Sequence, residues 1–158
     1  MVVANTSPIN YLVLIGQMDV LPALFGEITI PQAVRDELTH PDAPAPLRAW
    51  IAHPPTWLHV EAVVSDETDP TLQRLHRGER NAIVLAERLN ADLILLDERA
   101  AREVALTRGL QVTGLIGVLD EAATRDLVDI QDAVARLQET SFRATPRLLR
   151  WLLDRHKT

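Results

Sequence analysis

The sequence predicts an α/β fold around a mostly parallel β-sheet, and two short apolar runs are the clearest sign of it. Met1–Ala4 (MVVA) ends at Asn5, and Leu93–Leu96 (LILL) ends at Asp97. Apolar runs this short, bounded by polar residues, are typical of buried strands in a parallel sheet rather than of helices. Segments with a helical spacing of apolar residues lie between the strands, and this alternation is typical of α/β proteins.

Turn residues and apolar spacing divide the rest of the chain into further elements. Three more strands are expected at Ile28–Ile30, Trp57–Val64 and Gln111–Thr113. Ser7 as an N-cap and Pro8 at the first helical position predict where the first helix begins. The expected helices are Pro8–Gly16, Val20–Phe25, Pro31–Thr39, Leu47–His53, Gly78–Leu89, Ala100–Thr107, Gly114–Ala123, Asp129–Gln138 and Pro146–Arg155. The acidic stretch Ser65–Pro70 is expected to be a loop.

Length and composition favour one globular domain over residues 1–158. The chain is 47% hydrophobic and 24% charged, which is typical of a folded domain with a real core. It has no cysteine, so disulfides, thiolate metal sites and cysteine nucleophiles are excluded. The sequence shows no apolar stretch long enough to cross a bilayer and no basic secretory start. We therefore expect a cytoplasmic protein that does not use a membrane.

The charge balance gives a mixed indication about nucleic acids. A net charge of −6 is unusual for a surface that binds phosphates. However, bound cations would neutralise some of the carboxylates, and Lys157 is the only lysine, so nearly all basic residues are arginines. Arginine is suited to bidentate phosphate contacts, although genomic base composition explains the same bias.

Acidic and amide side chains stand at positions where a metal site is expected. Asn5 and Asp97 follow core strands, and the crevice beyond the carboxyl ends of parallel strands is where ligands bind. Glu37 and Glu79 lie on helices, and Glu98 adjoins Asp97. We expect side-chain oxygens of positions 5, 37, 79 and 97 to converge on one hard divalent cation, which prefers oxygen ligands. Such a cluster supports metal-assisted hydrolysis of a phosphodiester.

Each of the glutamates also has a purely structural interpretation. Glu37 suits a solvated helix face, Glu79 is favourable in a first helical turn, and Glu98 suits a helix cap. Asp97 is the exception, because an acid that directly follows four apolar strand residues is seldom placed there by chance.

Taken in order, several motifs resemble those of PIN-domain proteins. The matching motifs are Asn5-Thr6-Ser7-Pro8, Ile30-Pro31 with Val34 and Glu37, Gly78-Glu79 with Ala82-Ile83, Leu95-Leu96-Asp97-Glu98 with Ala101-Arg102, and Val112-Thr113-Gly114 with Gly117-Val118-Leu119. The resemblance spans nearly the whole chain and depends on the order and spacing of these motifs together. It points to the DUF3368 branch, whose members resemble the VapC-like toxin ribonucleases of bacterial and archaeal toxin–antitoxin pairs.

The resemblance implies a three-layer α/β/α sandwich and an endoribonuclease that uses Mg²⁺ or Mn²⁺ to hydrolyse RNA. It also implies the toxin role in a type II toxin–antitoxin pair, a small antitoxin partner and a homodimer. Carried over by position, the metal ligands are Asn5, Glu37, Glu79, Asp97 and Glu98, and the catalytic residues are Asp97, Glu79 and Glu37. The Thr6 and Ser7 hydroxyls are possible helpers. Ser7, Arg99 and Arg102 are the expected substrate-binding residues. The arginines are chosen because they stand beside Asp97, and they suit a role as partners of nearby acids equally well.

Asn5 departs from the family pattern, in which aspartate is usual. An amide oxygen ligates a metal but brings no charge. This leaves open an alternative, a catalytically attenuated PIN-like module that binds RNA or a protein. An unrelated doubly wound domain ranks last, because the segment Gly114–Gly117 is too short and too apolar for a phosphate loop.

Basic and aromatic residues outside these motifs have no settled role from sequence. Arg143, Arg147 and Arg150 suit RNA phosphates, an antitoxin or simply a solvated helix. The three tryptophans, Trp50, Trp57 and Trp151, suit either an interface or the core.

Overall fold

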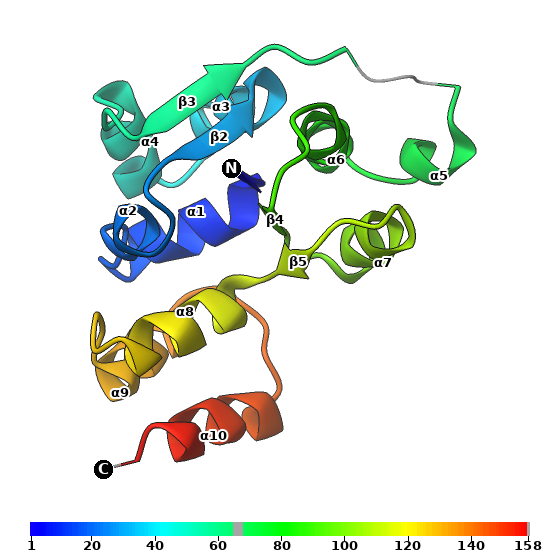
Figure 1. The fold of residues 1–158 in the computed structure, drawn as a ribbon. Helices are drawn as coiled ribbons and strands as arrows, with labels where there is room; N and C mark the ends of the chain where they lie inside the picture. The colour runs from blue at the N-terminus through cyan, green and yellow to red at the C-terminus, as the bar shows by residue number, and fades with distance from the viewer. Residues whose placement is uncertain (65–67, 158) are drawn as a thin grey trace.

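A five-stranded parallel β-sheet forms the centre of the computed structural model, which describes residues 1–64 and 68–157 (Figure 1). The strands are β1 (Val2–Ala4), β2 (Ile28–Pro31), β3 (Leu58–Glu61), β4 (Leu93–Leu95) and β5 (Val112–Thr113). Their order in the sheet is β3-β2-β1-β4-β5, and every neighbouring pair is parallel. The predicted α/β/α sandwich is confirmed, and the sheet is parallel throughout the described residues.

Ten helices surround this sheet in the part of the chain that the structure describes. They are α1 (Thr6–Leu14), α2 (Val20–Phe25), α3 (Gln32–Leu38), α4 (Ala45–Ala52), α5 (Pro70–Gln73), α6 (Arg77–Arg88), α7 (Arg99–Thr107), α8 (Leu115–Thr124), α9 (Ile130–Gln138) and α10 (Pro146–Arg155). Each predicted helix is present, and α5 is additional. Of the predicted acidic loop Ser65–Pro70, residues 65–67 lie outside the described residues.

Side chains that alternate along the central strands build two apolar cores, one on each face of the sheet. Val3 and Ile94 pack with residues of α5, α6 and α7. Val2, Ala4 and Leu95 pack on the other side with residues of α1, α2, α8, α9 and α10. Because helices cover both faces of the sheet, the central strands β1 and β4 are apolar at every position, which explains their continuous apolar runs.

The first helix begins earlier than its sequence predicts. Helix α1 starts at Thr6, with Asn5 as its N-cap, and Ser7 is already inside the helix. The Ser7 hydroxyl donates a hydrogen bond to Asp97 Oδ2 over 2.9 Å, so it is engaged across the sheet instead of capping its own helix. Pro8 is tolerated in the first turn because the N–H groups there have no acceptor within the helix.

Register between β1 and β4 brings two predicted site residues to one edge of the sheet. Ala4 is paired with Leu95, and the Asn5 N–H donates to the Leu95 carbonyl over 3.0 Å. The chain then leaves β1 at Asn5 and leaves β4 toward Asp97, so both side chains stand at the carboxyl ends of adjacent strands. In the described ranges, no helix is long and apolar enough to cross a membrane.

Candidate functional site

An open cleft of about 930 Å³ lies at the carboxyl ends of β1, β4 and β5. Its lining residues come from the ends of these strands, from the first turns of α1, α6, α7 and α8, and from part of α10. Every predicted site residue lines this one cleft, namely Asn5, Ser7, Glu37, Glu79, Asp97, Glu98, Arg99 and Arg102. The topology therefore brings all of them to a common space, although they come from the loops after β1 and β4 and from helices α1, α3, α6 and α7.

Asp97 is held in place by donors from two helices. Its Oδ1 accepts a hydrogen bond from the Leu115 N–H over 2.7 Å, at the start of α8, and its Oδ2 accepts from Ser7. An N-terminal helix end favours a negative charge, so α8 stabilises the carboxylate. A Cβ on Gly114 would lie 2.7 Å from Asp97 Oδ1 and 2.6 Å from Arg102 Nη1. Only glycine allows this approach of carboxylate and guanidinium.

Glu37 and Asn5 form a second group beside the first turn of α6. The Thr6 hydroxyl donates a hydrogen bond to Glu37 Oε2. A Cβ on Gly78 would lie 2.5 Å from Glu37 Oε1 and 3.2 Å from Asn5 Oδ1, so both oxygens face the same bare stretch of backbone. Asn5 is buried, and its Oδ1 has no hydrogen-bond partner among residues 1–64 and 68–157.

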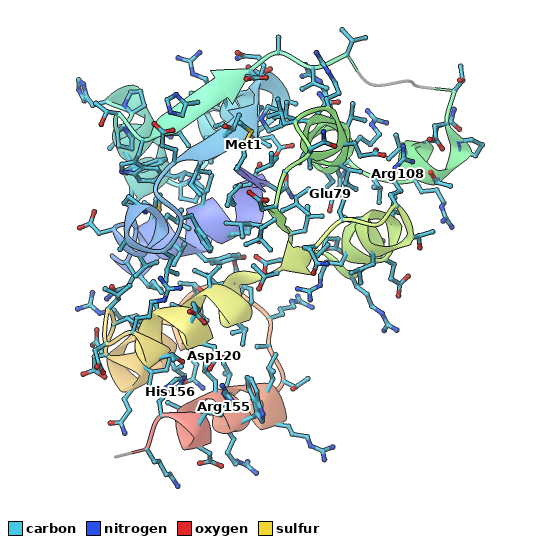
Figure 2. The ribbon with its side chains drawn as sticks, viewed as in Figure 1. Met1, Glu79, Arg108, Asp120, Arg155 and His156 are labelled. Atoms are coloured by element: carbon cyan, nitrogen blue, oxygen red, sulfur yellow. The ribbon has the colours of Figure 1, made fainter. Side chains whose placement is uncertain are left out.

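Glu79 has a structural role in addition to its place in the cleft. This side chain projects from α6 (Figure 2) and is 5% exposed. Its Oε1 accepts a hydrogen bond from the His76 N–H over 3.0 Å. The contact caps the first turn of α6. Burial raises the pKa of Glu79, the His76 contacts oppose the rise, and the charges of Glu98 and Glu37 add to it.

Two arginines stand at the start of α7 within the same cleft. Arg102 is half-buried, and its Nη1 donates to the Leu96 carbonyl over 3.3 Å. Arg99 forms an exposed ion pair with Glu103, with 3.2 Å between Nε and Oε1. An exposed pair of this kind contributes little stability, so the Arg99 guanidinium is free to change partner at small cost. Glu98 is exposed at the N-cap position of α7.

The predicted convergence on one ion is incomplete. Within the described residues, no three histidine, aspartate or glutamate side chains lie close enough together to hold a metal ion. Each carboxylate instead accepts from its own donor: Glu37 from Thr6, Glu79 from the His76 N–H, and Asp97 from Ser7 and Leu115. The three carboxylates therefore line the same cleft, but each is bound to a different donor.

The donor set nevertheless fits a hard divalent cation. Every candidate ligand offers an oxygen, which Mg²⁺ and Mn²⁺ prefer over nitrogen or sulfur. A buried amide oxygen with no partner in the described chain, at Asn5, is an acceptor that a cation would satisfy. The bare backbone at Gly78 leaves room beside it for the Glu37 carboxylate.

Sequence reasoning missed several residues that shape the cleft. Gly78 and Gly114 are expected from the sequence as helix starts and as parts of the family motifs, but not as the points where the backbone closely approaches Glu37 and Asp97. The segment between α9 and α10 also lines the cleft. A hydrogen bond of 2.9 Å between the Tyr11 hydroxyl and Ser141 Oγ joins this segment to α1. That contact joins residues 130 positions apart, so no local pattern in the sequence could indicate it.

Raised carboxyl pKa values predict a pH-dependent effect of neutralising Glu79. A carboxyl whose pKa is raised by folding makes its stabilising contribution at low pH and loses it as the pH rises through the folded-state pKa. The Glu79→Gln variant, which keeps an acceptor for the His76 N–H, should therefore unfold at higher urea concentration than the wild type at pH 8. The gain should vanish near pH 4, where the wild-type carboxyl is largely protonated.

Urea unfolding followed by circular dichroism at both pH values measures this effect. Glu61→Gln, an exposed acid on β3 outside the cleft, is the matched control and should show no such gain. A Glu79→Gln protein that is less stable than the wild type at pH 8 would show that the charged cap outweighs the cost of burial.

Comparison with known proteins identifies the family. A family model described as the PIN domain, DUF3368, matches residues 1–158. No match is found among curated proteins or solved structures. PIN domains are generally nucleases that use divalent metal ions, so a nuclease-like, hydrolytic function follows from the match. The chain belongs to the PIN-domain family.

Proposed function

We propose that this protein is an endoribonuclease that hydrolyses RNA phosphodiester bonds with Mg²⁺ or Mn²⁺. The observation that supports it most is the shared cleft, at the carboxyl edge of a PIN-domain sheet, that Asn5, Glu37, Glu79 and Asp97 all line. The resemblance to VapC-like ribonucleases supports the finer part of the proposal. That part is a cytoplasmic toxin of a type II pair, with a small antitoxin and a homodimeric state.

In this proposal, Asn5, Glu37, Glu79 and Asp97 hold the cation, and Glu98 is an additional ligand. When bound, Mg²⁺ or Mn²⁺ would stabilise the negative charge that builds on the phosphoryl oxygens during hydrolysis. Burial and the neighbouring charges of Glu98 and Glu37 raise the pKa of Glu79, so a cation would relieve an existing electrostatic cost. Ser7 and the Leu115 N–H fix the Asp97 carboxylate and limit its motion.

Arg99 and Arg102 are the proposed contacts to the RNA backbone. Arg102 uses one N–H on the Leu96 carbonyl and keeps further donors for a phosphate oxygen. Arg99 is exposed at the rim of the same cleft. Guanidinium groups bind phosphates through two parallel hydrogen bonds, so they orient the strand as well as attract it. A local pair of arginines thus offsets the acidic balance of the whole chain.

The approach at Gly78 predicts a variant that weakens metal binding without weakening the fold. In Gly78→Ala, the new methyl would displace the end of the Glu37 side chain from Asn5. Affinity for Mn²⁺ should fall roughly tenfold or more, as is typical when ligand support is disturbed. Because alanine is favoured over glycine in a helix by up to about 1 kcal/mol, the free energy of unfolding should not decrease.

A titration with Mn²⁺ followed by electron paramagnetic resonance, with urea unfolding in parallel, tests this expectation. Unchanged affinity in a protein of unchanged stability would remove Glu37 and Asn5 from the proposed ligand set. A loss of affinity together with a loss of stability would attribute the effect to misfolding.

Removal of the central acids should abolish RNA cleavage. Asp97→Ala and Glu79→Gln should each lower kcat by about 100-fold or more, because each removes a charged group from the reacting site. The measurement is cleavage of structured RNAs in Mg²⁺ or Mn²⁺, with Glu61→Gln as the control that keeps activity. Cleavage that survives both substitutions would count decisively against the assigned site.

Asn5 favours one second candidate, a catalytically attenuated PIN-like module that binds RNA or a protein. A neutral amide stands where the family usually has a carboxylate, and it is 6% exposed. In the same assay, Asn5→Asp should strongly raise Mn²⁺ affinity and cleavage if the module is attenuated. An unchanged rate would remove that candidate and leave the active nuclease.

A further inference from the structure

One end of the cleft is aromatic and basic rather than acidic. Phe142 and Arg143 come from the segment before α10, and Leu148 and Trp151 come from α10 itself. Trp151 is 48% exposed although it lines the cleft, whereas the neighbouring helix positions Leu149 and Leu152 are buried. None of these four residues has a role in the proposed hydrolysis.

The Trp151 ring is contacted by Arg155, and Arg155 forms an ion pair that joins α10 to α8. The guanidinium carbon of Arg155 lies 4.9 Å from the centroid of the Trp151 ring. Arg155 in turn donates to Asp120 from Nε over 3.0 Å and from Nη2 over 3.4 Å. His156 Nε2 is 2.8 Å from Asp120 Oδ1, so Asp120 on α8 faces both Arg155, the last residue of α10, and His156, which follows it (Figure 2). One face of the Trp151 ring is therefore covered by the Arg155 guanidinium, which its hydrogen bonds to Asp120 hold in place.

Three arginines in α10 and just before it have no ion-pair partner in the described residues. Arg143, Arg147 and Arg150 are exposed and form no ion pair with any acidic residue in 1–64 or 68–157. Of the three, Arg143 lines the cleft together with Trp151, and an aromatic ring with a free guanidinium in the same cleft matches a nucleic-acid strand better than an apolar helix. The exposed apolar area is also small, because only Leu148 and Trp151 contribute large side chains on this helix.

We propose that Trp151 is a stacking platform for a nucleobase of the RNA that the cleft binds, and that Asp120 and Arg155 position its ring. Aromatic side chains hold unpaired bases by stacking on their faces, while arginines follow the backbone. Arg143 contacts a phosphate of the same strand, and the acidic end of the cleft receives the scissile bond. The inference rests on the proposed function for the identity of the ligand.

Binding of a short unstructured oligoribonucleotide tests the platform, with EDTA present so that nothing is cleaved. Stacking contributes about 1–3 kcal/mol per base, so Trp151→Ala should weaken binding about 5- to 150-fold in an anisotropy titration. Trp151→Phe should keep most of the affinity. The matched control is Trp50→Phe, because Trp50 packs against Trp57 at a centroid distance of 6.1 Å and is absent from the cleft lining.

Tryptophan fluorescence separates stacking from a merely structural role. RNA should quench the emission of the wild type and of Trp50→Phe, and the quenching should be lost in Trp151→Phe. Asp120→Asn should reduce the quenching at saturating RNA while circular dichroism stays unchanged, because the ring loses its fixed orientation.

The outcomes distinguish this inference from the nuclease proposal. Equal RNA affinity and equal quenching in Trp151→Ala and the wild type would overturn the platform even if cleavage is observed. Trp151-dependent quenching in a protein that cleaves nothing would support the platform and contradict the nuclease. Trp151→Ala that disrupts a dimer in size-exclusion chromatography and leaves RNA affinity unchanged would overturn the platform in favour of a protein interface.

Discussion

The parallel pairing of β1 with β4 determines where everything else in the site stands. A backbone hydrogen bond from the Asn5 N–H to the Leu95 carbonyl is the last contact of this pairing. Beyond it, the segments that follow β1 and β4 leave the sheet at the same edge. Helix α1 then starts at once, so its Ser7 hydroxyl reaches Asp97 across the strand boundary. A shift of one residue in this register would turn the side chains of β4 to the opposite faces and separate Asp97 from Ser7.

The acidic cleft carries an electrostatic cost that the fold distributes over several donors. Burial raises the pKa of both Glu79 and Asp97, and the Glu98 charge raises them further. The Leu115 N–H, the Ser7 hydroxyl and Arg102 oppose the rise at Asp97. A structure that needed only stability would replace such groups with neutral ones. Their presence at the ligand-binding edge of a PIN-domain sheet supports the proposal that the cleft binds a cation.

The fold could be predicted from the sequence because the central strands, β1 and β4, are short, apolar and almost wholly buried. The sequence also identified Asp97, since a polar residue that ends an apolar run must leave the sheet at its carboxyl edge. Glu37 and Glu79 were candidates from their place on helices and from the family resemblance, but only the packing of α3 and α6 decides whether their side chains reach that edge. The fit at Gly78 and Gly114, the contact between Tyr11 and Ser141, and the place of Trp151 depend on tertiary packing. Local patterns carry no information about such contacts, and the same limit explains the error at the start of α1.

Crystals of the protein soaked in Mn²⁺ offer the most direct measurement of the central claim, through the anomalous scattering of the ion. The account predicts a peak in the cleft, ligated by Asp97 and by at least two of Asn5, Glu37 and Glu79, with Glu37 or Glu79 turned away from its present donor. A cleft without a peak at millimolar Mn²⁺, or a peak bound only by residues outside it, would contradict the account.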